Sequence, residues 1–313
     1  MRPLSYAFAI ACLLQSLPSA VSATEKMNGF NLENALVPVD QIHNGGVPRD
    51  GIPALYTPKF VDASSADFLL DSDRVLGVHR NGEAKAFPIK IMNYHEIVND
   101  DFNGAGVVVS FCPLCGSGIA FAVDVERGGF GVSGLLYNSD VLMYDRKTES
   151  LWSQILGKAI SGPARGASLE AIPISNTNWE IWRQRYPGTK VLSPETGYGR
   201  NYDRDPYTEY RRSGRLWFPV VAKDRRFKSK SMVVGISFEG RFKAYPLNEL
   251  PDAKTSIDDS FAGRRLTVQY DKSSASADVF DASGREWPSV TLFWFAWVAF
   301  HPDTQVYVSP DEK

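Results

Sequence analysis

Short apolar runs separated by polar turns extend along most of the chain, and one such pattern occurs twice. The segment "VLGVHRNGEAKAFPI" (75–89) is similar to "VVGISFEGRFKAYPL" (233–247), and the shared glycines, lysine, alanine and proline are displaced by 158 positions. Asn81-Gly82 in the first segment and Glu239-Gly240 in the second stand where a tight turn joins two strands. The pattern therefore predicts a β-hairpin at the start of each of two related halves.

The similarity between the halves continues beyond the hairpins. Apolar strands are predicted over 107–111 and 266–270, and "WRQRYPGTKV" (182–191) matches "WVAFHPDTQV" (297–306) at an offset of 115. The last pair predicts a Trp-bearing helix that ends before a proline. Because the offset falls from about 159 to 115, the first half carries roughly 44 extra residues between 121 and 182, with 131–154 as their probable core.

These patterns predict a β-rich α+β fold in which two pseudo-repeated halves form one globular unit. Each half consists of a hairpin, a short helix, a strand and a Trp-bearing helix. The expected organisation is a signal peptide (1–23), an N-terminal extended segment (24–73), the first pseudo-repeat (74–193), a connector (194–231) and the second pseudo-repeat (232–308).

The N-terminus has the features of an export signal. Arg2 precedes the apolar run "AFAIACLL" (7–14), and Val21-Ser22-Ala23 fits the small-x-small cleavage rule. No later stretch approaches the roughly 20 apolar residues that cross a bilayer. We therefore expect a periplasmic or secreted protein that begins near Thr24 and has no transmembrane segment.

Composition narrows the function only a little. The net charge of −2 over 313 residues gives no electrostatic basis for binding nucleic acid or an anionic membrane surface. The sequence contains neither a phosphate-binding loop nor a His-Glu-x-x-His motif.

Cysteine is the residue type that carries the most information. Cys12 lies in the predicted signal, so the exported chain would hold only Cys112 and Cys115. Cys-Pro-Leu-Cys-Gly resembles the metal-binding knuckle of rubredoxins and zinc ribbons, and the Gly116-Ser117-Gly118 that follows is a poor start for the helix of a thioredoxin-like motif. A metal site is favoured, while a redox-active thiol pair and an inert disulfide remain open.

The second half serves as an internal control. At the positions of Cys112 and Cys115 it has Asp271 and Ser274, and His95 faces a position near Ala253. Residues common to both halves are expected to serve the scaffold, and residues found in only one half are candidates for function.

One knuckle supplies two ligands, so others must come from elsewhere. His95 is the first candidate because it shortly precedes the cysteine strand, and Met143 in the added segment is the first guess for a fourth ligand. Two thiolates with an imidazole and a thioether suit copper, or zinc as the alternative. His79 and His301 are interpreted as scaffold residues, and His43 as a loop residue. Candidates for acid–base or substrate-facing roles are Glu96, Asp140, Tyr144 and Asp145.

Several of these segments together resemble one known family. "NYHEIVND" (93–100), "FCPLCGSGIAF" (111–121), "GVSGLLYNSDVLMYDRKTESLWSQ" (131–154) and "RYPGTKVLSPETGYGRNYDRDPY" (185–207) look like a bacterial exported family of unknown function, the DUF3179 type. The resemblance covers nearly all of the expected exported chain, and it implies export and a shared site but no particular reaction. The candidate site residues that it carries over are His95, Glu96, Cys112, Cys115, Tyr137, Asn138, Ser139, Asp140, Met143, Tyr144 and Asp145.

Three functions follow as hypotheses, and whether the protein is an enzyme stays open. The leading hypothesis is an exported metal-binding protein in metal delivery, electron transfer or redox catalysis. The second is a periplasmic thiol–disulfide oxidoreductase in which His95 or Glu96 shuttles protons. The third is a non-enzymatic module that binds a small molecule or an exported protein partner in a groove between the halves.

Overall fold

Strands dominate the protein, as the sequence predicts. The computed structural model describes residues 26–124, 127–252 and 255–308, of which 42% lie in strands and 13% in helices. The predicted signal peptide, 1–23, lies outside the described residues. Among the described residues, no helix combines the length and hydrophobicity needed to span a bilayer.

The first predicted hairpin is present and forms the middle of a five-stranded sheet. Arg80 pairs with Glu83 across the Asn81-Gly82 turn. Gly77 lies under the ring of Trp182, where a β-carbon would come within 2.2 Å of the indole, so only glycine fits there. The strands, in the order in which they pair, are β15 (Ser175–Asn178), β5 (Arg74–Arg80), β6 (Glu83–Pro88), β16 (Lys190–Leu192) and β4 (Phe60–Asp62).

A second, four-stranded sheet carries the cysteines. The helix α1 (Ile89–His95) connects β6 to this sheet, and the helix α2 (Trp179–Arg185) follows β15. Nearly all side chains of the two central strands are buried, as their continuous apolar runs predict. The strands, in pairing order, are β14 (Glu170–Ile172), β9 (Ser117–Ala122), β8 (Ala105–Cys112) and β7 (Ile97–Phe102).

The second half contains two sheets whose strand order and pairing directions match those of the first half, except that β4 has no counterpart. In each half the last strand pairs in parallel with the hairpin, through Lys190 and Lys85 in one and through Gln305 and Lys243 in the other. One sheet is β23 (Ser289–Phe293), β17 (Met232–Phe238), β18 (Arg241–Pro246) and β24 (Gln305–Val306); the other is β19 (Ser256–Phe261), β20 (Arg264–Asp271), β21 (Ser276–Asp281) and β22 (Glu286–Trp287). The helix α4 (Trp294–Phe300) precedes β24.

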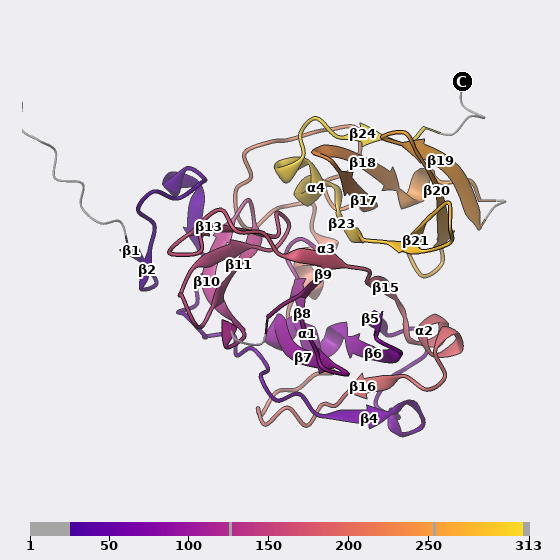
Figure 1. Cartoon of the computed structure of the whole chain (residues 1–313), viewed down its shortest axis with the longest axis horizontal. Coiled ribbons are helices and arrows are strands. Elements are labelled where there is room, and N and C mark those ends of the chain that lie inside the picture. The colour runs from indigo at the N-terminus through magenta and orange to yellow at the C-terminus, as the bar shows by residue number, and fades with distance from the viewer. Residues whose placement is uncertain (1–25, 125–126, 253–254, 309–313) are drawn as a thin grey trace, which may run out of the picture.

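The added segment of the first half forms a further sheet, drawn in magenta at the left of Figure 1. Its strands, in pairing order, are β13 (Lys158–Ser161), β12 (Leu151–Ser153), β11 (Asp140–Asp145), β10 (Phe130–Tyr137) and β3 (Ile42–Asn44). The remaining elements are β1 (Lys26–Met27), β2 (Phe30–Asn31), α3 (Thr208–Arg212) and three short 3-10 turns (Val39–Gln41, Ala63–Ser65 and Leu247–Glu249).

The two halves hold each other reciprocally. Strand β15 of the first half contacts β21 of the second, and β23 of the second contacts β9 of the first. At the first contact Ser175 Oγ donates a hydrogen bond to Asp278 Oδ1 (2.8 Å), and Arg185 forms a 2.6 Å salt bridge to the same carboxylate. At the second, Phe293 N–H donates to the carbonyl of Cys115 (2.8 Å). The cysteine loop is thus held from both halves.

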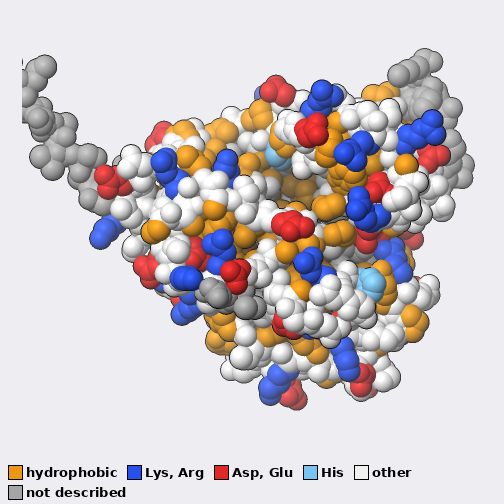
Figure 2. All heavy atoms as spheres, in the orientation of Figure 1, with side chains coloured by type: hydrophobic (Ala, Val, Ile, Leu, Met, Phe, Trp, Pro, Cys, Tyr) orange, Lys and Arg blue, Asp and Glu red, His pale blue; other side chains and the backbone are white. Residues whose placement is uncertain are grey.

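His79 and His301 are packing residues, in agreement with their interpretation as scaffold. His79 stacks on Tyr186 at 4.9 Å between ring centroids, and His301 stacks on Phe242 at 3.8 Å. His301 also lines a largely apolar cavity of about 460 Å³ between β9, β17 and α4. Figure 2 shows hydrophobic side chains gathered in a hollow near the position of α4. Burial lowers the pKa of His301 to about 4.

The low pKa of His301 predicts a loss of stability in acid. As the pH falls below 6.5, His301 binds a proton in the unfolded chain, whereas in the folded protein it stays neutral down to about pH 4. Because each pKa unit corresponds to about 1.4 kcal/mol, this residue should cost on the order of 3 kcal/mol across that interval. Urea unfolding at pH 7 and pH 4 should show this loss in the wild type relative to His301→Phe. Parallel losses in both proteins would contradict the assignment.

Candidate metal centre

The two cysteines lie at the turn between β8 and β9. Cys112 is the last residue of β8 and pairs with Ser117, the first of β9, while Cys115 lies in the loop between them. Both are free thiols, only 1% and 0% exposed. Gly116 has φ +65°, which permits the tight return of the loop into β9. The hydroxyl of Tyr210 donates to the carbonyl of Leu114 (2.9 Å), so the connector also fixes this loop.

A second tight turn, between β10 and β11, faces the cysteine loop. Its central residues, Asn138 and Ser139, have φ +54° and +65°, the left-handed pair of a type I′ hairpin turn. This conformation is strained for serine, and tertiary hydrogen bonds hold it. The Asn138 side chain accepts from Val221 N–H (2.9 Å) and donates to Ala299 (3.2 Å), and the Ser139 hydroxyl donates to Phe218 (3.0 Å).

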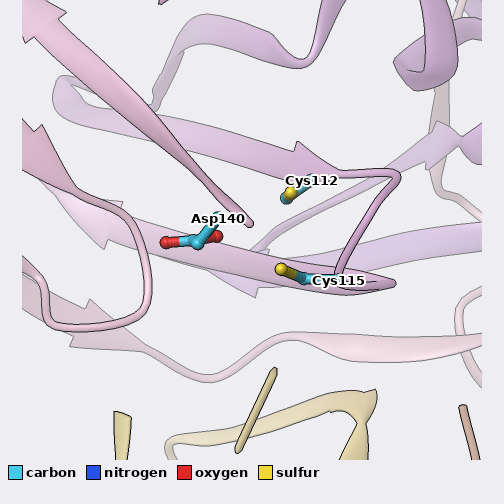
Figure 3. Close-up of side chains that lie close together, drawn as sticks. All are labelled: Cys112, Cys115 and Asp140. Carbon is cyan, nitrogen blue, oxygen red and sulfur yellow. The ribbon is translucent and has the colours of Figure 1, made fainter. Parts of the chain in front are cut away.

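The two turns bring three ligand-type side chains together. A sulfur of Cys112, a sulfur of Cys115 and a carboxylate oxygen of Asp140 all lie within 4.8 Å of one another. Figure 3 shows the two sulfur atoms on one side of the group and one oxygen of Asp140 turned toward them. Both thiols also approach the carbonyl of Ser139, at 3.7 Å from Cys112 and 3.4 Å from Cys115.

The Asp140 carboxyl is fully enclosed and only half satisfied. Its Oδ2 accepts a hydrogen bond from Ile155 N–H (3.0 Å), whereas Oδ1 has no hydrogen-bond partner in the part of the chain that the structure describes. Burial raises the pKa of Asp140 to about 8. Burial, together with the neighbouring Cys112 thiol, also raises the pKa of Cys115 well above its usual value. Desolvation therefore keeps these groups protonated near neutral pH unless a cation joins them.

A buried polar network supports the cysteine hairpin from the added segment. Gln154 accepts from the Ser117 hydroxyl (2.7 Å) and donates to the Ser110 hydroxyl (2.9 Å). Ser110 in turn donates to the carbonyl of Ile119 (2.9 Å). Since Ser110 and Ser117 flank the cysteine loop, the network fixes the β8–β9 hairpin relative to the turn that follows β12.

The structure does not bring His95 into the group of ligand atoms at the cysteines. Its Nδ1 lies 2.8 Å from the carbonyl of Pro53, and its Nε2 lies 2.7 Å from the hydroxyl of Tyr202. A carbonyl accepts only from an N–H, so Nδ1 carries the hydrogen and Nε2 accepts from the tyrosine. Both ring nitrogens are therefore engaged, and His95 joins the N-terminal segment to the connector.

Glu96 is the predicted residue whose environment is most unusual. It follows α1 with φ +56° and ψ −31°, an uncommon backbone conformation for a side chain of this size. Burial, and then the nearby carboxyl of Asp140, raise the pKa of Glu96 to about 8. Glu96 lines a cavity of about 120 Å³ together with Leu114, Val141 and Tyr207. Leu114 belongs to the cysteine loop and Val141 follows Asp140, so this cavity adjoins the metal-ligand candidates.

The other predicted residues of β11 have different surroundings. Met143 is buried in the same hydrophobic cluster as the two cysteines, where its strand pairs with Val132 and Trp152. The hydroxyl of Tyr144 donates to Asp50 (2.6 Å) in a separate cluster. Asp145 accepts from the Trp152 indole N–H (2.9 Å), which gives this carboxylate a structural role.

Two contributors to the site were missed by reasoning from the residues. The Ser139 carbonyl belongs to the backbone and leaves no signal of its own in the sequence. Gln154 is a single glutamine at the end of the added segment, where nothing marks it as buried. The run Tyr137-Asn138-Ser139-Asp140, which the family resemblance already carried over, is the signal that points to this turn.

Comparison with known families identifies the family of the chain. A family model described as "Protein of unknown function (DUF3179)" matches residues 49–304. The chain belongs to the DUF3179 family. The DUF3179 match includes both halves, the added segment and each of the three clustered ligand candidates. No curated protein and no solved structure matches the chain.

The burial of both thiols predicts that they resist modification in the native DUF3179 protein. In a Cys12→Ser chain without metal, we expect Cys112 and Cys115 to react with 5,5′-dithiobis(2-nitrobenzoate) at pH 8 at least about 100-fold more slowly than after unfolding in guanidinium, because reaction requires an accessible thiolate. Absorbance at the wavelength of the released thiolate measures both rates. Rapid labelling of either cysteine in the folded chain would contradict the described burial.

Proposed function

We propose that the protein binds one transition-metal ion through Cys112, Cys115 and Asp140. The observation that carries this proposal is the convergence of three ligand-type side chains within 4.8 Å in a fully buried position. Without a cation, burial raises the pKa values of Asp140 and Cys115 and keeps both groups protonated near neutral pH. A divalent ion would replace up to three protons and supply the positive charge that the described surroundings lack.

Zinc suits this ligand set better than copper. The copper preference from sequence depended on His95 and Met143 as partners of the thiols. The cluster of ligand-type side chains includes the carboxylate of Asp140, a hard oxygen ligand that zinc accepts readily and that the softer Cu(I) ion disfavours. The carbonyl oxygen of Ser139 adds a further oxygen donor on the same side. Cys₂Asp with an oxygen or a water in the fourth position is a tetrahedral set for zinc.

The cavity beside the centre favours a site that exchanges ligands over a closed structural site. Catalytic zinc sites keep three protein ligands and an open position, whereas structural sites have four protein ligands. Here three protein side chains cluster, and a space of about 120 Å³ adjoins them. That volume holds only a few water molecules or a very small molecule. With the export signal expected from the sequence, we propose a periplasmic or secreted metalloprotein.

Thiol–disulfide exchange is the second candidate function. The observation in its favour is that two free thiols lie close together in one loop. Against it stand the burial of both sulfurs and the raised pKa of Cys115, because exchange requires an accessible thiol of low pKa.

We further propose that the two halves arose by duplication and that only the first retained the centre. The equivalent loop of the second half also spans four residues between paired strands, with Asp271 opposite Ser276 where the first half has Cys112 opposite Ser117. Asp271 there accepts from the backbone N–H groups of Ser273 (2.8 Å) and Ser274 (3.1 Å). In this loop a carboxylate accepts hydrogen bonds from the backbone, at the position that the Cys112 thiol occupies in the first half.

Metal analysis tests the proposal. The protein loaded with zinc and passed through a desalting column should retain one equivalent by plasma mass spectrometry. Removal of a group that only hydrogen-bonds to a metal ligand lowers metal affinity by about 10–100-fold. Removal of a ligand itself should have a larger effect, so Cys112→Ser, Cys115→Ser and Asp140→Asn should each weaken zinc binding by more than about 100-fold. Loading with Co²⁺ should give a thiolate-to-cobalt absorption band that the cysteine variants lose.

Two further variants make this experiment decisive. Asp303→Asn, an exposed residue in the loop after α4, should bind zinc like the wild type. His95→Gln should also retain binding, because both nitrogens of His95 are engaged elsewhere. Substoichiometric zinc in the folded wild type, or retention of one equivalent in Cys112→Ser, would rule out the proposed centre. Copper held more tightly than zinc would overturn the choice of metal.

A further inference from the structure

A large cleft lies at the junction of the two halves, apart from the small cavity beside the centre. It encloses about 670 Å³, within the range of small-molecule sites, and it is lined from both halves and from the connector. Apolar side chains form much of its wall, including Phe111, Pro113, Met232 and Phe293. Pro113 and Gly116 belong to the cysteine loop, so that loop forms part of one wall of this cleft.

Arg74 at the start of β5 places a positive charge in this cleft. Its guanidinium donates to the carbonyls of Ser274 and Asn176 and to the Asn176 side chain, all uncharged oxygens. It forms no salt bridge with any residue that the structure describes, and burial alone lowers its pKa to about 10. A buried charge is normally paired, so an uncompensated guanidinium lining a cleft marks a place for an anionic group of a ligand.

The other charged groups of the cleft pair with one another, and the one carboxylate in excess, Asp203, is largely exposed to solvent. Lys90 pairs with Asp73 at 2.9 Å and with Asp203 at 3.4 Å. Arg211 pairs with Asp205. Among the positively charged residues of the described lining, Arg74 is therefore the one without an acidic partner.

Asn93 adds an unsatisfied acceptor to the same cleft. This residue of α1 is only 5% exposed, and its Nδ2 donates to Asp205 (3.3 Å). Its Oδ1 is buried and has no hydrogen-bond partner among the described residues. A buried acceptor without a donor costs free energy, and an N–H or O–H of a ligand would remove that cost.

We propose that the cleft between the halves binds an organic monocarboxylate that has an apolar body and a hydrogen-bond donor, such as an N-acylated amino acid or the C-terminal residue of a peptide. The carboxylate pairs with Arg74, and the donor reaches Asn93 Oδ1. The apolar body packs against Phe111 and Phe293. This assignment gives a ligand class to the binding-module hypothesis and does not depend on metal at the cysteines.

Calorimetric titration of the full-length protein with two matched probes tests this assignment. N-acetyl-L-phenylalanine has the carboxylate, the aromatic ring and an amide donor, and N-acetyl-L-phenylalaninamide differs only in lacking the charge. The acid should bind at least about tenfold more tightly than the amide, as expected for one charge-assisted pair. Arg74→Gln should abolish this preference, and Asn93→Leu should weaken both probes while preserving their ratio.

Two controls separate the cleft from the rest of the molecule. Arg285→Gln removes an exposed arginine from the β21–β22 turn and should leave both affinities unchanged. Removal of metal by a chelator should also leave them unchanged, so a failed metal proposal would not affect this test. Equal affinity for acid and amide in the wild type would overturn the proposal, and so would the absence of binding by either probe up to the order of 10 mM. If Arg74→Gln does not fold, the affinities of the two probes for the wild type and for Asn93→Leu are sufficient to test the proposal.

Discussion

The enclosure of the Asp140 carboxyl is the constraint on which the arrangement of the first half depends. A carboxyl group in the protein interior costs free energy unless neighbours donate hydrogen bonds to it or a cation joins it. Ile155 supplies one such bond, and the two thiols lie beside the carboxyl. To hold the carboxyl there, the chain adopts a left-handed turn at Asn138 and Ser139, and the connector and α4 secure that turn by hydrogen bonds. The hydrogen bonds of the Asn138 and Ser139 side chains therefore hold the strained turn that keeps the Asp140 carboxyl in the interior.

Local patterns allowed much of the scaffold to be predicted. The hairpin at Asn81-Gly82 follows from alternating strands around a turn dipeptide, and the helix at Trp182 ends where its proline predicts. The cysteine loop was correctly placed between two strands, because the glycines after Cys115 disfavour a helix. Each of these features is determined by residues close together in sequence, where propensity and turn chemistry act.

The composition of the centre could be predicted only in part, because it depends on contacts between distant segments. Asp140 comes to the cysteines through a hairpin that the sequence marks only as an added segment, and it was expected there as an acid–base group instead of a ligand. His95 lies near Cys112 in the chain, yet the end of α1 turns its ring toward Pro53 and Tyr202. Which way a side chain points at the end of a short helix is decided by the tertiary partners that surround it, and a single sequence does not contain that information.

The hydrogen bond from Phe293 to Cys115 determines the stage of folding at which the cysteine loop can close. Phe293 lies near the C-terminal end of the described chain, and β23 completes the surroundings of β9. A nascent chain that has not yet reached β23 therefore contains the cysteines and Asp140 but lacks the strand that closes the loop. Pairings across so many residues form late in folding. The topology therefore makes closure of the cysteine loop a late event, which follows synthesis of the second half.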